Sequence, residues 1–395
     1  MGEKKYLGIL SGIMVVAVLI ATLWPFDPYP ADRVTWLPQA DGIRFGSPGV
    51  VISKAPLLGG GNGGCSLEFL LRPSEIRREY TIATFYDPDN PEKFQVKQWT
   101  DGLLVVRSVM DARKKVQKKK FYVDHAFRLD QLVLLTMVSG QSGTIVYLNG
   151  LPAKILPRFT ITEKDLSGQI VLGTAANDYE PWPGEIRGLA IYTRELTREE
   201  ILRHYENVRA YGSDPSDLQG ASALYRFKEG AGHEILNAVA SGPDLQIPIR
   251  FNLPYKLLLA SPVQEFGANW GYVKDVLLNI AGFVPLGFLL CAFFGLARSR
   301  KSSIVYTVLV GGMLSFVIEV LQFYIPRRVS GTTDIITNTL GAALGAVLAR
   351  PQWVRIVIRG TDSTSRERIR SWGVNRQWIE EVAPVMRGCR SCDPR

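Results

Sequence analysis

Three apolar segments near the C-terminal end of the chain each carry a carboxylate with an amide three or four residues away. The pairs are Asp275 with Asn279, Glu319 with Gln322, and Asp334 with Asn338. These spacings place both members of a pair on one face of a helix. A charged group inside a membrane helix costs about 2.5–3.5 kcal/mol on insertion scales, and such groups normally face the interior of a bundle. The sequence therefore predicts a polar site within the membrane.

Two arginines lie between the second and third of these pairs, in the sequence FYIPRRVSGTTD. Arg327 and Arg328 can be interpreted as solvated loop residues, since the bias of positive charge towards the cytoplasm is only statistical. They can also form a guanidinium fork that pairs with Glu319 or Asp334, or that holds a phosphate or carboxylate. Their place directly between those two carboxylates favours the second interpretation.

Four apolar spans must position these side chains. They cover residues 7–24, 276–297, 304–325 and about 333–349. Pro285 in the second span predicts a kink or a broken helix, because proline removes a backbone donor. The fourth span is short, and its Gly341 and Gly345 have the small-xxx-small spacing that favours close helix packing. We therefore expect an all-α transmembrane four-helix bundle.

Positive charge is concentrated beside these spans. Residues 25–272 carry 28 Lys and Arg against 28 Asp and Glu, and the rest carries 18 against 9, which is the whole net charge of +9. Basic residues at 4–5, at 298–301 and in the tail predict that both termini are cytoplasmic and that the long block between the first two spans is extracytoplasmic. No A-x-A-like cleavage site follows the first span, so we expect an uncleaved anchor. Because the excess base flanks apolar segments, no nucleic-acid binding is predicted.

The block between the first two spans has the pattern of an all-β domain. Its short apolar or alternating runs, separated by Gly, Pro, Asn and Asp, are CSLEFLLRP, YTIATFYD, GLLVVRSVM, QLVLLTMVSG, GTIVYLNGLPA and SGQIVLGT. About a dozen strands over roughly 200 residues fit a sandwich or jelly roll. Thr197 and Glu200 have the spacing of a capping box and predict the start of a short helix.

The segments DVLLNIAGFVPLGFLL and SFVIEVLQFYIPRRVSGTTDIITNTLGAALGA resemble the VanZ-like family of small bacterial integral membrane proteins. The resemblance covers the last third of the chain and the first span. It includes the six paired residues with Pro285, Gly287, Phe323, Pro326, Arg328, Gly341 and Gly345. The resemblance implies a multi-pass protein of the bacterial plasma membrane. The founding member is associated with low-level teicoplanin resistance, which we do not transfer to this chain, and the long insertion departs from the family pattern.

The insertion itself resembles the concanavalin A-like, laminin-G-type module from about residue 40 to 248. The resemblance rests on TIVYLNGLPAKI and on GEIRGLAIYTRELTREEI, and it implies a jelly-roll sandwich that binds a glycan or a protein. Some such modules hold calcium through loop Asp and Asn, and Asn177, Asp178 and Glu180 form an acidic loop here. Because no D-x-D-x-D-G spacing appears, we predict no metal and no cofactor, and calcium in the sandwich stays an alternative.

A basic hairpin, MDARKKVQKKKFYVD, is a further candidate in the insertion. Its bases are Arg113, Lys114, Lys115, Lys118, Lys119 and Lys120. Such a run is usually a solvated strand pair protected against edge aggregation. The alternative is a local patch for an anionic cell-wall polymer or for lipid headgroups.

Classical soluble catalysis finds little support in the sequence. His125, His204 and His233 lie far apart, and no H-E-x-x-H, G-x-S-x-G, P-loop or dinucleotide motif is present. His204 is expected to be an ordinary surface or packing residue. Cys389 and Cys392 form a single C-x-x-C, which is a weak metal or redox signal.

The expected organisation is a multidomain membrane protein. Residues 1–29 form the cytoplasmic N-terminus and first transmembrane helix, 30–250 the external sandwich, 251–272 a linker, 273–350 a VanZ-like bundle of three transmembrane helices, and 351–395 a basic cytoplasmic tail. Besides the lipid bilayer, the expected partners are an envelope glycan or protein and an envelope lipid. The leading hypothesis is a binding or accessory protein, and the alternatives are a hydrolase or transferase acting on a lipid-linked saccharide or phosphate, or a structural anchor that displays the sandwich.

Overall fold

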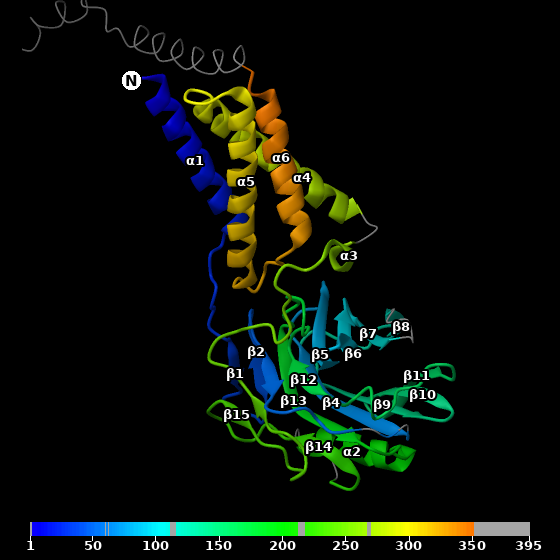
Figure 1. Cartoon of the computed structure of the whole chain (residues 1–395). Helices are drawn as coiled ribbons and strands as arrows, with labels where there is room; N and C mark the ends of the chain where they lie inside the picture. The colour runs from blue at the N-terminus through cyan, green and yellow to red at the C-terminus, as the bar shows by residue number, and fades with distance from the viewer. Residues whose placement is uncertain are drawn as a thin grey trace, which may run out of the picture. The chain divides into compact units, whose positions relative to one another are not determined.

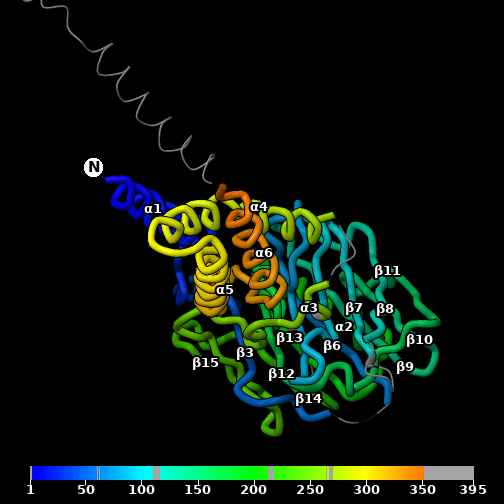
Figure 2. The backbone as a smooth tube through the Cα atoms, turned by 45° about the horizontal axis from the view of Figure 1, so that its top comes forward, coloured from blue at the N-terminus to red at the C-terminus, as the bar shows by residue number. Residues whose placement is uncertain are grey.

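The computed structural model of the chain describes residues 2–59, 61, 63–110, 116–211, 218–266 and 270–350. The chain divides into two compact units, which Figure 1 and Figure 2 show in two views. The helical unit comprises Met1–Trp24, Leu259–Val320 and Gly331–Arg395, and the β unit comprises Pro25–Leu258 with Leu321–Ser330. The predicted tail with its C-x-x-C, and residues 111–115 of the basic hairpin, lie outside the described residues.

Two antiparallel sheets of eight strands form the β unit. The order in the first sheet is β1 (Val34–Trp36), β2 (Ile43–Phe45), β13 (Gly184–Tyr192), β4 (Cys65–Pro73), β9 (Val133–Gly140), β10 (Gly143–Leu148) and β11 (Leu151–Leu156), and β14 (Ala221–Tyr225) also pairs with β13. The order in the second sheet is β15 (Glu234–Ile235), β16 (Leu245–Gln246), β3 (Val51–Ser53), β12 (Gln169–Leu172), β5 (Glu79–Asp87), β6 (Asn90–Trp99), β7 (Gly102–Met110) and β8 (Val116–Val123). The predicted all-β sandwich is confirmed.

The core of the β unit lies between the two sheets. Side chains alternate along the strands, and Phe69, Phe85 and Phe94 are fully buried in this core. Trp182 is also fully buried, and its Nε1 donates a hydrogen bond of 2.7 Å to Gln98 Oε1, as a buried indole requires. The described residues contain sixteen strands, more than the dozen or so expected, because several have only two or three residues and cannot show alternation.

Helix α2 (Arg198–Tyr211) packs its buried face against the outer side of the first sheet. The predicted capping box is confirmed: the backbone N–H of Glu200 donates to Thr197 Oγ1 at 3.2 Å, and that of Thr197 donates to Glu200 Oε2 at 2.8 Å. The Arg194 guanidinium also binds both carboxylate oxygens of Glu200, at 2.8 and 2.9 Å. The hydrogen bonds from Arg194, with those from Thr197, lower the pKa of Glu200 to about 2.

The helical unit contains α1 (Glu3–Leu23), α3 (Pro262–Glu265), α4 (Trp270–Phe294), α5 (Arg300–Phe323) and α6 (Thr332–Leu348), although residues 321–323 of α5 belong to the β unit. One apolar cluster contains a residue from each of the four long helices: Val18 of α1, Leu286 of α4, Ile318 of α5 and Ala342 of α6. Helices α1, α4 and α5 are long and apolar enough to cross a membrane, whereas α6 has 17 residues. The helical membrane region is therefore confirmed, and the count of four spans stays a prediction.

Helices α4 and α6 pack closely through glycine. A Cβ atom on Gly341 would lie 2.3 Å from the backbone oxygen of Ile280, and one on Gly345 would lie 2.1 Å from that of Val284. The predicted close packing of the small-xxx-small segment is therefore confirmed. Helix α4 continues without interruption through Pro285, so the broken helix offered as one alternative is wrong. Close contacts with α6 lie on both sides of this proline, at Val284 and at Gly287.

Candidate functional site

Three carboxylates from separate elements meet at the first turn of α6. Glu319 of α5 accepts a hydrogen bond of 2.8 Å from the backbone N–H of Gly331, and Glu265 of α3 accepts one of 3.0 Å from that of Thr333. Asp334 is the acidic residue of the turn itself. The first N–H groups of a helix lack internal acceptors, and Gly331 has no side chain that could serve them. The helix dipole also favours negative charge at this end.

The amides of the predicted pairs join different helices. Asn279 Nδ2 of α4 donates to Asp334 Oδ1 of α6 at 2.7 Å. Asn338 Nδ2 of α6 donates to Ser315 Oγ of α5 at 3.0 Å, and this hydroxyl lies 3.5 Å from the backbone oxygen of Asp334. The structure therefore brings Asn279, Glu319, Asp334 and Asn338 together in the helical unit.

The burial of these side chains differs. Glu319 is 1% exposed and Asn338 is 3% exposed, whereas Asp334 is half-buried and Asp275 is exposed. Within the described residues, Asn338 Oδ1 and Thr333 Oγ1 are buried side-chain atoms with no hydrogen-bond partner. Buried polar atoms normally have a partner, so these two atoms could accept or donate to a bound molecule.

The sequence analysis missed two members of this group. Glu265 lies in the predicted linker, and its position shortly before an apolar span is the only signal in the sequence that could have indicated a role in the site. Ser315 precedes Glu319 by four residues, the spacing that places both on one helix face. A serine within an apolar span is common, however, so the spacing alone would have been a weak signal.

Three other predicted site residues, Gln322, Arg327 and Arg328, belong to the β unit. Lys256 Nζ donates to the backbone oxygens of Gln322 and Ile325, at 3.1 and 2.6 Å, and so satisfies carbonyl groups at the end of α5. Burial lowers the pKa of Lys256 to about 8. Arg328 is half-buried, and its backbone N–H donates to the backbone oxygen of Ile325 at 3.0 Å.

Arg327 lies beside the predicted external loop. Its guanidinium is 4.9 Å from the centre of the Tyr179 ring, which in turn meets Phe251 edge to face. The predicted pairing of an arginine with Glu319 or Asp334 stays a prediction.

The acidic side chains of the external loop have protein partners. Glu180 forms an ion pair of 2.9 Å with Lys97, and Asn177 Nδ2 donates to Glu92 Oε1 at 3.4 Å. Asp178 accepts a hydrogen bond of 2.7 Å from the backbone N–H of Tyr179. In the part of the chain that the structure describes, no three His, Cys, Asp or Glu side chains are arranged to hold a metal ion.

Other polar groups of the β unit are also engaged in internal contacts. Lys118 of the basic hairpin pairs with Glu92. His204 is buried, and its Nδ1 lies 2.9 Å from Glu68 Oε2, while Thr136 donates to the other oxygen of Glu68 at 2.8 Å. The expectation that His204 is a packing residue agrees with this position, but its buried carboxylate partner was not foreseen.

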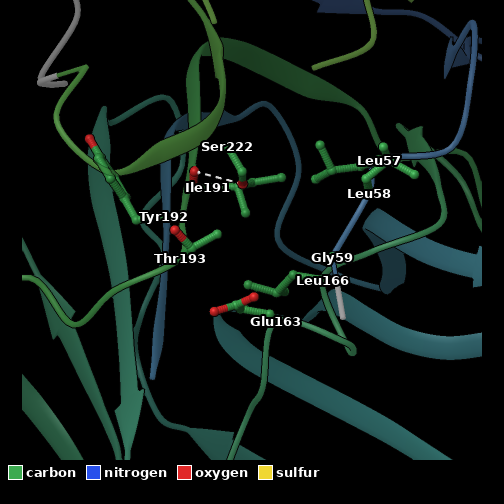
Figure 3. Close-up of a pocket in the computed structure, with 9 residues that line it drawn as sticks. All are labelled: Leu57, Leu58, Gly59, Glu163, Leu166, Ile191, Tyr192, Thr193 and Ser222. Atoms are coloured by element: carbon green, nitrogen blue, oxygen red, sulfur yellow. Dashed lines mark hydrogen bonds between the residues drawn. The ribbon is translucent and has the colours of Figure 1, made fainter. Parts of the chain in front are cut away.

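A small pocket opens in the β unit beside the glycine-rich segment after β3 (Figure 3). Its lining residues are Leu57, Leu58, Gly59, Glu163, Leu166, Ile191, Tyr192, Thr193 and Ser222. The hydroxyl of Ser222 is directed to the backbone oxygen of Ile191 at 3.2 Å, and Glu163 accepts from the backbone N–H of Gly61 at 3.2 Å. Because these polar groups serve the protein itself, the pocket offers little for a ligand to recognise.

Two parts of the chain match known families. Residues 233–356 match the VanZ/LLP1 family, and residues 45–202 match the concanavalin A-like lectin/glucanases superfamily. The chain therefore contains a VanZ-like region and a concanavalin A-like domain. Both resemblances inferred from the sequence are thereby confirmed. The VanZ-like match contains all the carboxylates and amides at the first turn of α6.

Solved structures share only a remote likeness with this chain. A candidate carbohydrate-binding protein from Bacteroides ovatus is 13% identical, with 53% of this chain and 58% of that chain covered and a TM-score of 0.39. The binding domain of botulinum neurotoxin serotype D is 18% identical, with 45% and 46% covered and a TM-score of 0.33. The chain spans about half the length of these structures, and TM-scores this low do not bear on ligand or function. No curated protein matches the chain.

Proposed function

We propose that this VanZ-like protein is a binding or accessory protein of the bacterial cell envelope. The observation that carries the proposal is the convergence of Glu265, Glu319 and Asp334 on the first turn of α6. Beside it lie buried atoms of Asn338 and Thr333 that have no hydrogen-bond partner among the described residues. Buried polar groups of this kind are uncommon in membrane helices and usually mark a functional site.

The chemistry of the cluster favours a ligand rich in hydrogen-bond donors. Carboxyl oxygens can accept hydrogen bonds, and the Asn338 atom without a partner among the described residues is a carbonyl oxygen that also accepts. Saccharide hydroxyls and peptide amides supply the matching donors. The polar part of an envelope lipid or of a glycopeptide-like ligand therefore fits the site better than an isolated phosphate, which offers mainly acceptors.

The charge distribution of the helical unit supports an outward-facing site. Arg300, the first residue of α5, donates to the backbone oxygen of Val347 at the end of α6, and the guanidinium of Arg298 lies 4.3 Å from the ring centre of Tyr306. The N-terminal part of α1 is at the same end, since Gly8 approaches Phe293. Arg298 and Arg300 thus lie at the end of the bundle where α1 and α5 begin and α6 ends, and Glu265, Glu319 and Asp334 lie where α6 begins; Figure 1 shows these helix ends. The positive-inside rule then assigns the basic end and both termini to the cytoplasm, and the sandwich to the outside.

The sandwich is proposed to bind a glycan or a protein of the envelope, which is the role that a lectin-like domain suggests.

A hydrolase or transferase has less support, because Glu265 and Glu319 already accept backbone hydrogen bonds at the helix terminus. A purely structural bundle would gain only about 0.6 kcal/mol from each hydrogen bond between membrane helices, and it would need no buried carboxylate.

Native mass spectrometry of the full-length, detergent-extracted protein tests this proposal. We expect the wild type to retain a lipid-sized ligand that the Glu319→Gln/Asp334→Asn double variant loses. Glu3→Gln is the matched control, because it removes an exposed carboxylate in α1, outside the site but in the same unit, and should leave the ligand in place. Thermal unfolding must first establish that each variant is folded.

The outcomes separate the three functions. A ligand retained equally by all three proteins, or by none, would overturn the proposed membrane site. Chemical conversion of the retained lipid during incubation with the wild type, but not with the double variant, would favour the enzyme.

A further inference from the structure

A row of charged side chains crosses the outer face of the first sheet. Glu185 of β13 stands directly opposite Arg44 of β2 on one side and opposite Arg72 of β4 on the other. The adjacent residues Ile43 and Ile186 lie in the core between the sheets, so the charged side chains point outwards. Helix α2 packs over the other end of β13, against Ala190 and Tyr192.

A third arginine, Arg187, follows Glu185 by two residues in β13, and alternate residues of a strand share one face of the sheet. The pairing of β13 with β4 becomes irregular at this point, between Ile186 and Gly188. Arg44 donates to Glu185 Oε1 through Nη2 at 2.7 Å and Nε at 3.3 Å, and Arg187 donates to Oε2 through Nη2 at 2.7 Å and Nε at 3.2 Å. Arg72 Nη1 lies 3.9 Å from Oε2, and its Nε donates to the backbone oxygen of Asp130 at 2.9 Å.

The arginine cluster, defined as Arg44, Arg72 and Arg187, has more charge than its carboxylate can balance. Among the described residues, Glu185 is the carboxylate within ion-pair distance of all three, so two positive charges are left over. Glu185 is 2% exposed, whereas the side chains of Arg44 and Arg72 are 56% and 36% exposed. One arginine would suffice to neutralise a buried carboxylate, and an excess of them adds repulsion.

We propose that the arginine cluster is a binding site for the oxyanion groups, phosphate or carboxylate, of an acidic envelope glycan. The inference rests on the proposed glycan-binding role of the sandwich and identifies the charge of its ligand. Planar guanidinium groups bind such oxyanions through two parallel hydrogen bonds. Glu185 holds Arg44 and Arg187 in fixed orientations, which lowers the entropy cost of ordering them on a ligand.

The site differs from the one that sequence alone suggested. The described bases of the basic hairpin, Lys118, Lys119 and Lys120, are consecutive residues of β8, and Lys118 is paired with Glu92. The arginine cluster instead takes one residue from each of β2, β4 and β13, and Arg187 is more than a hundred residues from the other two in the chain. Only the strand order brings them together.

The test measures binding of the full-length, detergent-solubilised protein to immobilised poly(glycerol phosphate), to polygalacturonate, and to neutral dextran. We expect binding to one or both acidic polymers and none to dextran, with affinity falling as salt rises. The Arg44→Gln/Arg72→Gln variant should lose about tenfold or more in affinity. Which acidic polymer binds more tightly distinguishes phosphate from carboxylate as the recognised group.

The matched control is Lys119→Gln/Lys120→Gln, which removes the same formal charge from exposed residues of the other sheet and should leave the affinity unchanged. If the arginine double variant does not fold, Arg72→Gln alone serves, because its contact with Glu185 is the longest of the three. Equal losses in the arginine and lysine variants, or binding to dextran alone, would overturn the proposal. The Glu319→Gln/Asp334→Asn protein should bind the acidic polymer like wild type, so a failure of the membrane site and a failure of the arginine cluster can be told apart.

Discussion

Asn279 in α4 donates its side-chain amide to the carboxylate of Asp334 in α6 across 2.7 Å, although the two residues are 55 positions apart. This hydrogen bond joins the two helices whose glycines make the closest backbone contacts of the bundle. This hydrogen bond therefore links the polar site to the close packing of α4 against α6.

Replacing Asn279 tests that coupling. Asn279→Ala should lower the stability of the helical unit by about 0.6–1.7 kcal/mol, the range for hydrogen bonds between membrane helices. Asn279→Asp should cost more, because it sets a second carboxylate against Asp334. Thermal unfolding in detergent measures both. Asp275→Ala, one turn away and exposed, is the control, and a loss as large as that of Asn279→Ala would show that the interhelical bond contributes nothing specific.

The α4–α6 contact should not tolerate a side chain at Gly341. A Cβ there would lie 2.3 Å from the backbone oxygen of Ile280, so Gly341→Ala must push the helices apart, at a cost of about 1–3 kcal/mol. Gly282→Ala in α4 is the matched control, because no atom lies within 4 Å of the Cβ it adds. We expect that control to be neutral or slightly stabilising, since alanine has the higher helix propensity. Equal stability of the two variants would mean that α4 and α6 do not pack this closely.

The capping box of α2 predicts a dependence of stability on pH. Hydrogen bonds from Arg194 and Thr197 lower the pKa of Glu200 from 4.5 to about 2. The unfolded state therefore binds more protons between these pH values, and this contribution to stability is present above about pH 4.5 and is lost as the pH falls towards 2. Glu200→Gln should remove that part of the acid sensitivity. Glu199→Gln, at the exposed neighbouring position, should retain it, which unfolding curves from pH 2 to 7 can determine.

The partly buried Lys256 predicts that stability also depends on pH in the alkaline range. Burial lowers its pKa from 10.5 to about 8, so between these values the unfolded state holds a proton that the folded state has lost. The free energy of unfolding should therefore rise as the pH increases from about 8 to 10.5. Lys256→Met should abolish the rise and remove two hydrogen bonds at the end of α5. The exposed Lys228→Met variant is the control, and a rise that persists unchanged in Lys256→Met would assign the effect to another group.

Local patterns in the sequence were sufficient to predict the longer helices and strands of both units, although not the strands of two or three residues. Alternation over a few residues predicted strands such as β4 and β5, and unbroken apolar runs predicted α1, α4 and α5. Thr197 and Glu200 predicted their own hydrogen bonds, because a capping box closes within four residues. In each case the interacting groups are neighbours in the chain, so spacing alone defines the geometry.

The sequence by itself also determined which residue types are available for the membrane site, since carboxylates and amides stand out in apolar spans. Only the tertiary structure decided their partners: Asn279 bonds to Asp334 and not to Asp275, Glu265 enters from the linker, and Arg327 lies over Tyr179. The arginine cluster around Glu185 likewise depends on the order of β2, β13 and β4. The physical reason is that a hydrogen bond or ion pair forms only within about 3–4 Å. Which distant segments come that close depends on how whole helices and sheets pack, and no local spacing encodes it.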